Sequence, residues 1–104
     1  MPTAKKLDAL GNYELTLFVS GNTALSARAI VNIRSICETH LKGRYTLEIV
    51  DLTQTPERAS QAEIIALPTL VKSNPRPLRR FIGDLSDPLR LLHGLDIDPQ
   101  KEFA

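Results

Sequence analysis

Cysteine is nearly absent from this sequence, and tryptophan is wholly absent. The 104 residues include one cysteine, Cys37. A single cysteine excludes a disulfide within the chain and fits a reducing compartment, so we expect a cytoplasmic protein. Stability must then come from a hydrophobic core, and a chain of this length builds only a modest one.

Long apolar segments, strong net charge and ligand motifs are missing too. The longest apolar runs fall far short of the roughly 20 residues that cross a bilayer. The formal net charge is +1, too small to favour nucleic acid or a membrane surface. Gly21 stands alone, so there is no phosphate-binding loop, and neither His40 nor His93 stands in a recognisable metal motif. We expect no catalytic residue, metal or cofactor, and no nucleic-acid or membrane partner.

The first half of the sequence has the periodicity of a βαβ unit. Apolar residues alternate over 13–20, with Phe18 on the opposite face, which is typical of a central strand covered on both sides. Helical spacing follows over 25–41, with Thr23 or Ser26 available as the N-cap. A second alternating segment, 45–51, is expected to pair in parallel with the first.

The second half carries weaker signals. A cap, a proline and an acid at 55–57 predict a helix that runs to about Ala66, although its apolar face is thin. Residues 64–71 could equally form a strand. If the helix forms, Pro68 ends it and a short strand covers 69–72.

A turn, another strand and a last helix complete the expected order. The strand covers 78–82, and Ser86-Asp87-Pro88 predicts a helix start. Gly94 lies inside this helix and weakens it. The helix has an apolar stripe of Leu89, Leu92 and Leu95.

The resulting order, β-α-β-α-β-β-α, is that of a single α/β domain of the thioredoxin-like class. Pro68 stands where that class has its cis-proline. We expect the domain over 13–97, with a mobile N-terminal segment at 1–12 and a polar tail at 98–104. A redox enzyme of this class needs a low-pKa thiolate at the start of the first helix. That region has no cysteine, and the helical spacing places Cys37 in the core. A thioredoxin-like enzyme with non-standard redox chemistry therefore remains only as the alternative.

Basic residues gather near the second hairpin. Lys72, Arg76, Arg79 and Arg80 form the one basic cluster of the sequence. Such residues either protect a solvated edge strand from aggregation or bind an acidic protein partner, and the sequence favours neither.

Several motifs resemble the KaiB family, the circadian-clock proteins of cyanobacteria. The similarity covers about residues 13–97 and is most specific at 79–87. The matching motifs are Gly21-Asn22-Thr23, Val50-Asp51-Leu52, Ala66-Leu67-Pro68-Thr69-Leu70, Arg79-Arg80-Phe81-Ile82-Gly83-Asp84-Leu85-Ser86-Asp87 and Gly94-Leu95-Asp96. The resemblance implies a non-enzymatic regulator that binds a KaiC-like ATPase ring and modulates its phosphorylation, in a clock or a stress response.

The resemblance also implies residues that face the partner. The family's surface residues are retained at Asn22, Thr23, Arg28, Tyr45 and Lys72. Three positions depart from it: Thr46 replaces an alanine, and Glu48 and Glu63 each replace a lysine. Because two charges are reversed, a divergent paralogue with a different KaiC-like partner is as plausible as a core clock component.

The resemblance further implies two folds. One is the thioredoxin-like monomer; the other is a ground state ordered β-α-β-β-α-α-β that forms dimers and tetramers. We expect Pro68, Gly94 and Asp96 to take part in the switch. Helix propensity predicts that Gly94→Ala with Asp96→Arg favours the monomer.

Overall fold

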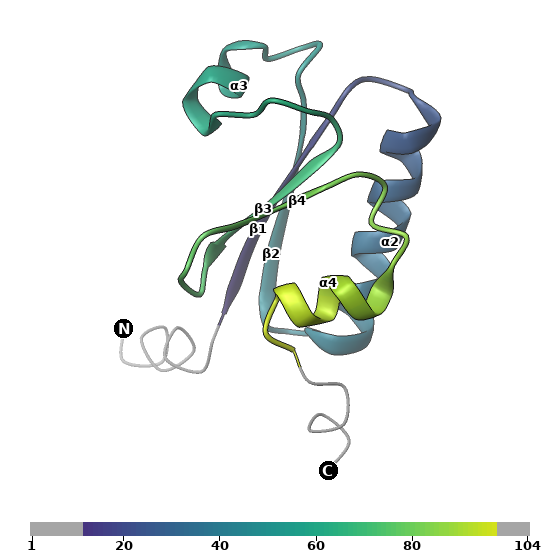
Figure 1. Ribbon diagram of the computed structural model, residues 1–104, viewed down its shortest axis with the longest axis vertical. Coiled ribbons are helices and arrows are strands. Elements are labelled where there is room, and N and C mark those ends of the chain that lie inside the picture. The colour runs from purple at the N-terminus through teal and green to yellow at the C-terminus, as the bar shows by residue number, and fades with distance from the viewer. Residues whose placement is uncertain (1–11, 98–104) are drawn as a thin grey trace.

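The computed structural model of the chain describes residues 12–97, which form four strands and three helices (Figure 1). The expectations for residues 1–11 and 98–104 lie outside the described residues. In chain order the elements are β1 (Tyr13–Val19), α2 (Ala24–His40), β2 (Tyr45–Asp51), α3 (Glu57–Ala62), β3 (Thr69–Asn74), β4 (Arg79–Ile82) and α4 (Pro88–Gly94). The expected order β-α-β-α-β-β-α is confirmed.

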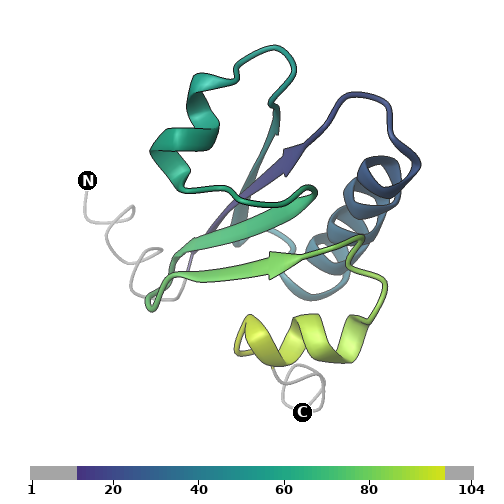
Figure 2. The ribbon, with the colours of Figure 1, turned by 45° about the horizontal axis from the view of Figure 1, so that its top comes forward.

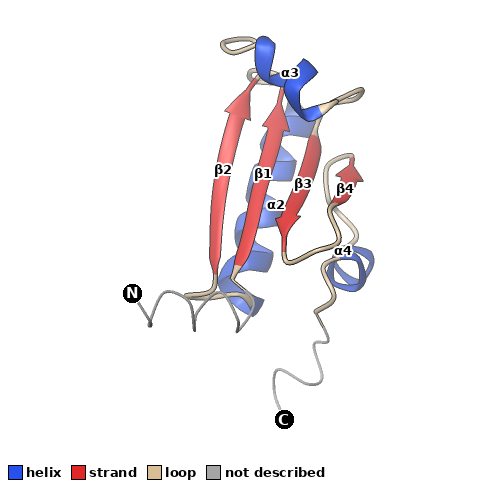
Figure 3. Cartoon of the chain, turned by 90° about the vertical axis from the view of Figure 1, so that its left-hand side faces the viewer, coloured by secondary structure: helices blue, strands red, loops and turns tan. Residues whose placement is uncertain are grey.

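The four strands form one mixed sheet in the order β2-β1-β3-β4, with the outermost positions taken by β2 and β4 (Figure 3). β1 pairs in parallel with β2, as the βαβ pattern predicts, and antiparallel with β3. β4 runs antiparallel to β3. The expected central strand is therefore β1, and Phe18 is buried on the side opposite Leu17.

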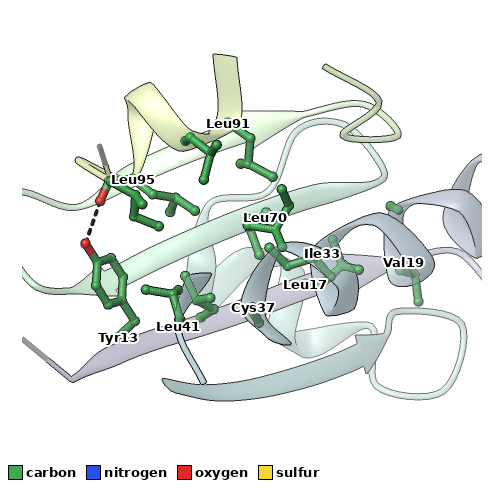
Figure 4. Packing of buried hydrophobic residues seen from close by; sticks show 14 residues of the cluster. Tyr13, Leu17, Val19, Ile33, Cys37, Leu41, Leu70, Leu91 and Leu95 are labelled. Atoms are coloured by element: carbon green, nitrogen blue, oxygen red, sulfur yellow. Dashed lines mark hydrogen bonds between the residues drawn. The ribbon is translucent and has the colours of Figure 1, made fainter. Parts of the chain in front are cut away.

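Helices α2 and α4 cover one side of the sheet, called here the α2–α4 face, which carries Leu15, Leu17 and Leu70. Their apolar stripes pack with the strands into the main core (Figure 4). The Tyr13 hydroxyl donates a hydrogen bond to the Leu95 carbonyl at 2.8 Å and so joins the first strand to the end of α4.

The opposite side, called here the α3 face, carries Phe18, Val50 and Val71. These three residues form a second, small buried cluster with partly buried residues beside it. The short helix α3 lies over this side and has no buried residue of its own. Figure 2 shows α3 and α4 on opposite sides of the sheet.

The starts of α2 and α4 follow their sequence signals, and the structure decides between the two candidate caps of α2. Thr23 is the N-cap, with its hydroxyl accepting from the Ser26 amide at 3.2 Å. Asp87 caps α4 by accepting from the Arg90 amide, with Pro88 at the first helical position.

The prediction for the second helix was wrong in its length. α3 ends at Ala62 because Glu63 takes a left-handed conformation with φ of 56°. Ile65, which a helix running to Ala66 would include, is 91% exposed. The Thr55 hydroxyl does not cap the helix and donates instead to the Asp51 carbonyl. Residues 64–68 form neither helix nor strand, so the alternative strand over 64–71 begins only at Thr69.

The expected stripe of α4 needs one correction. Leu92 and Leu95 are buried, but Leu89 is 66% exposed and Leu91 is buried instead. Positions 88, 91, 92 and 95 share a helix face, and the Pro88 start places Leu89 outside it.

Candidate partner-binding surface

The loop between β1 and α2 occupies the place of a thioredoxin redox motif. Its residues 20–23 are Ser-Gly-Asn-Thr, and the peptide bond before the nearby Pro68 is cis. Gly21 needs its left-handed φ of 53° for the turn. The position that would hold an attacking thiolate carries no sulfur.

The Asp51 carboxylate at the end of β2 holds this loop. Its Oδ1 accepts from the Thr53 hydroxyl at 2.7 Å, the Thr53 amide at 2.9 Å and the Gly21 amide at 3.1 Å. These hydrogen bonds, those from Thr53 first, lower the pKa of Asp51 because they stabilise the carboxylate. The loop is a hydrogen-bonded structural element.

Cys37 lies on the buried face of α2 with no exposed surface. Burial, with a smaller contribution from the Glu38 charge, raises the pKa of the Cys37 thiol to about 12. A thiol that stays protonated near neutral pH is a poor nucleophile. The prediction that Cys37 is a core residue is confirmed.

Three of the expected partner residues belong to the α3 face or its rim. Thr46 and Glu48 project from β2 on this side and are exposed, and Glu63 follows α3. Both acids have cationic neighbours. The Arg58 guanidinium contacts both Glu48 oxygens at 3.2 Å, and Arg80 lies 3.7 Å from a Glu63 oxygen.

Sequence patterns did not reveal these two counter-ions. Arg58 donates from α3 to β2, and the Glu48 contact is the main reason that the pKa of Arg58 is raised. Arg80 also donates to the Ala62 carbonyl at 3.2 Å and thus fastens α3 to β4. The only available signal was the change from lysine to glutamate at positions 48 and 63, because an acidic side chain is stabilised by a basic neighbour.

The other expected partner residues lie elsewhere. Asn22, Thr23 and Arg28 are exposed at the start of α2, where Arg28 lies 3.9 Å from Asp84. Tyr45 projects toward α2, and its hydroxyl donates to Glu38 at 2.7 Å; this bond is the main reason that the pKa of Tyr45 is raised. The structure therefore does not gather all eight residues into one patch.

The expectation that Lys72 belongs to an exposed basic cluster was wrong. Its side chain is fully buried; the Nζ atom donates to the Pro75 carbonyl at 2.8 Å and lies 3.9 Å from Asp96. Burial lowers the pKa of Lys72, partly offset by the Asp96 charge. In this fold Lys72 ties the 74–77 turn to the end of α4 and is inaccessible to a partner.

The two switch substitutions also need correction for this fold. A Cβ atom added at Gly94 would overlap the Phe81 ring, so alanine is not the stabilising change that helix propensity predicts. Arginine at position 96 would remove the only carboxylate within ion-pair distance of Lys72 among the described residues and place a second cation there. Both changes should destabilise the thioredoxin-like arrangement.

Within residues 12–97, no helix is long and apolar enough to span a bilayer. The same range contains no group of three or more histidine, cysteine, aspartate or glutamate side chains arranged to hold a metal ion.

Fold and site together define a thioredoxin-like domain that lacks the thiol centre of thioredoxins. The chain is similar to mitochondrial thioredoxin 3 of Saccharomyces cerevisiae, with a TM-score of 0.66 and 16% identity over 89% of this chain and 88% of that one. It is also similar to the N-terminal domain of SasA from Synechococcus elongatus, with a TM-score of 0.65 and 24% identity over 81% and 83% of the two chains.

Sequence comparison identifies the family. The KaiB domain model matches residues 16–97. The chain is 49% identical to the circadian clock oscillator protein KaiB of Synechococcus sp. strain CC9311, over 82% of this chain and 71% of that protein. It is 44% identical to the circadian clock protein KaiB3 of Synechocystis sp. strain PCC 6803, over 83% and 84%. The chain belongs to the KaiB family of circadian clock proteins, as its motifs indicated.

Proposed function

We propose that this protein is a non-enzymatic regulator that binds a KaiC-like ATPase ring in the cytoplasm and modulates its phosphorylation. The observation that carries the proposal is the match to the KaiB domain over nearly the whole described fold. The replacement of a redox motif by a capped Ser-Gly-Asn-Thr loop supports a binding role over catalysis. The process that it serves is a clock or a stress response.

The α3 face is the surface that we assign to the ring. Little apolar area is buried there, and Thr46, Glu48 and Glu63 are exposed on it or at its rim. Glu48 and Glu63 engage Arg58 and Arg80 only at the surface, where ion pairs exchange partners at low cost. We therefore expect the ring to carry basic groups opposite Glu48 and Glu63. A ring that binds family members with lysines at these two positions would carry acidic groups there instead.

We further propose a second arrangement of the C-terminal half, ordered β-α-β-β-α-α-β, that assembles as dimers or tetramers. The absence of any buried residue in α3 supports it, since unpacking α3 exposes little new apolar surface. Light scattering at micromolar concentration, combined with amide NMR, tests this proposal. A pure monomer with shifts of the thioredoxin-like fold at every concentration would contradict it.

Reconstitution with the purified KaiC-like ATPase of the host tests the proposed function. We expect co-elution with the ring in the presence of ATP and a changed time course of ring phosphorylation. Glu48→Lys with Glu63→Lys should weaken binding to this ring, whereas Ser35→Lys with Thr39→Lys, which adds two cations at exposed positions of α2 on the opposite side of the sheet, should leave it unchanged. No complex with any such ATPase of the host, under conditions where the fold is intact, would refute the proposal.

A further inference from the structure

Strand β4 is an edge strand: it pairs with β3 on one side, and none of the described elements pairs with its outer side (Figure 3). Of its residues, Arg79, Arg80 and Ile82 are exposed, and Ile82 exposes 63% of its surface. An exposed edge presents a row of unpaired amides and carbonyls, which an extended segment of another chain can pair with.

The register shows which backbone groups of β4 are free. The Gly83 amide donates to the Pro68 carbonyl at 3.0 Å, and Ile82 lies opposite Thr69. Residues that bond to the partner strand alternate with residues that do not in an antiparallel pair. The amides and carbonyls of Arg80 and Ile82 therefore point away from β3, toward the open side.

A groove of about 350 Å³ borders the strand on that side. It is lined by residues 80–87 together with Arg90 and Leu91 of α4, and none of the lining residues belongs to β3. Two acids also line it: Asp84, which accepts from the Ser86 amide and lies 3.9 Å from Arg28, and Asp87, which accepts from the Arg90 amide.

Unpaired cations surround this edge. Among residues 12–97, no carboxylate lies within ion-pair distance of Arg76, Arg79 or Arg90. Arg79 shares a strand face with Phe81, which packs beside α4, whereas Ile82 projects to the other side. A strand added here would therefore meet arginines on one of its faces and an exposed isoleucine on the other.

We propose that the β4 edge binds an extended peptide segment in which acidic and apolar residues alternate, by addition of a strand to the sheet. The acidic side chains contact Arg79 and Arg90, and the apolar ones cover Ile82. A second copy of this chain is disfavoured as the occupant, because full antiparallel overlap of two β4 strands places Arg79 and Arg80 opposite Ile82 and Phe81 of the other copy and so offers the arginines no acid. Arg80 of this edge contacts Glu63, but the arginines that carry the proposal, Arg79 and Arg90, contact neither Glu48 nor Glu63. The proposal therefore does not depend on the proposed function, and its test uses no ATPase ring.

The test uses a fluorescein-labelled hexapeptide of alternating glutamate and valine, with a lysine–valine peptide as its charge control. We expect saturable binding of the acidic peptide alone, with hydrogen-exchange protection of the Arg80 and Ile82 amides. A glutamate–valine peptide that is N-methylated at every second residue keeps its side-chain charge but loses the backbone N–H donors along one edge. It should bind at least about tenfold more weakly.

Two charge variants complete the test. Arg79→Glu with Arg90→Glu should weaken binding by about tenfold or more, whereas Arg79→Lys with Arg90→Lys should retain most of it. Unchanged melting temperatures would show that both variants fold. Absent binding, equal binding of the N-methylated peptide, or protection elsewhere on the sheet would overturn the proposal. Protection of Arg80 and Ile82 that rises with protein concentration and without peptide would assign the edge to a second copy and also overturn it.

Discussion

The two sides of the sheet differ in what they contribute. The α2–α4 face holds the main core, to which α2, α4 and two of the strands, β1 and β3, supply buried residues. The α3 face buries only Phe18, Val50 and Val71, and its helix has no buried residue. Hydrophobic stabilisation scales with buried apolar area, so the fold depends mainly on the first side. The second side is left free for polar and charged groups.

Core truncation on the two sides should have the largest and most unequal effects. Leu17 is fully buried on the α2–α4 face, whereas Ile64 is only partly buried beside the small cluster. We expect Leu17→Ala to cost about 2–5 kcal/mol of unfolding free energy, and Ile64→Ala to cost about 1 kcal/mol or less. Urea unfolding measures both. Equal losses of unfolding free energy in the two variants would contradict the conclusion that the fold depends mainly on the α2–α4 face.

Gly94→Ala tests how closely α4 packs on β4. The added methyl group would overlap the Phe81 ring, and forced overpacking costs about 1–3 kcal/mol. Repeating the change in a Phe81→Leu background provides the control, because the smaller side chain should relieve most of the loss. A stabilising effect of Gly94→Ala on the thioredoxin-like fold would show that helix propensity outweighs this contact.

Cys37→Ser should cost about 1–3 kcal/mol, because a hydroxyl group replaces the thiol in apolar surroundings. Burial raises the pKa of Cys37 to about 12, so the folded state disfavours the thiolate. Stability should therefore fall as the pH rises through the thiol pKa of the unfolded chain, about 8.5. Cys37→Ala should lack this component. Reaction of the native thiol with a disulfide reagent at pH 7, or Cys37-dependent insulin reduction, would restore the redox alternative.

Asp51→Ala should have the smallest effect, a lower melting temperature confined to higher pH. Hydrogen bonds from Thr53 and Gly21 lower the pKa of Asp51 in the folded state. Its contribution is therefore present above the unfolded pKa and disappears as the pH falls through the folded value. Wild type and variant should converge in acid. A constant difference from pH 7 to pH 2 would mean that the carboxylate charge is not what holds the loop.

The sequence predicts the N-terminal half better than the C-terminal half, for physical reasons. Strand alternation around Leu17 and helical spacing around Ile33 are local signals, and both elements formed as expected. The end of α3 depends on the left-handed Glu63, where the apolar run that follows suggested a longer helix. The burial of Lys72 depends on atoms of Pro75 and Asp96, and the fit of Gly94 depends on Phe81. Those are tertiary contacts that periodicity does not contain.

Hydrogen-exchange footprinting of the complex with the ATPase ring tests most directly whether the α3 face is the binding side. We predict slower exchange in residues 45–51 and 57–63 and around Asn22, with no change at the exposed side of α4 near Leu89 and His93. Glu48→Lys with Glu63→Lys should abolish the protection and leave the free protein's exchange pattern intact. Protection confined to α4 and the middle of α2, with residues 45–63 unchanged, would contradict this account.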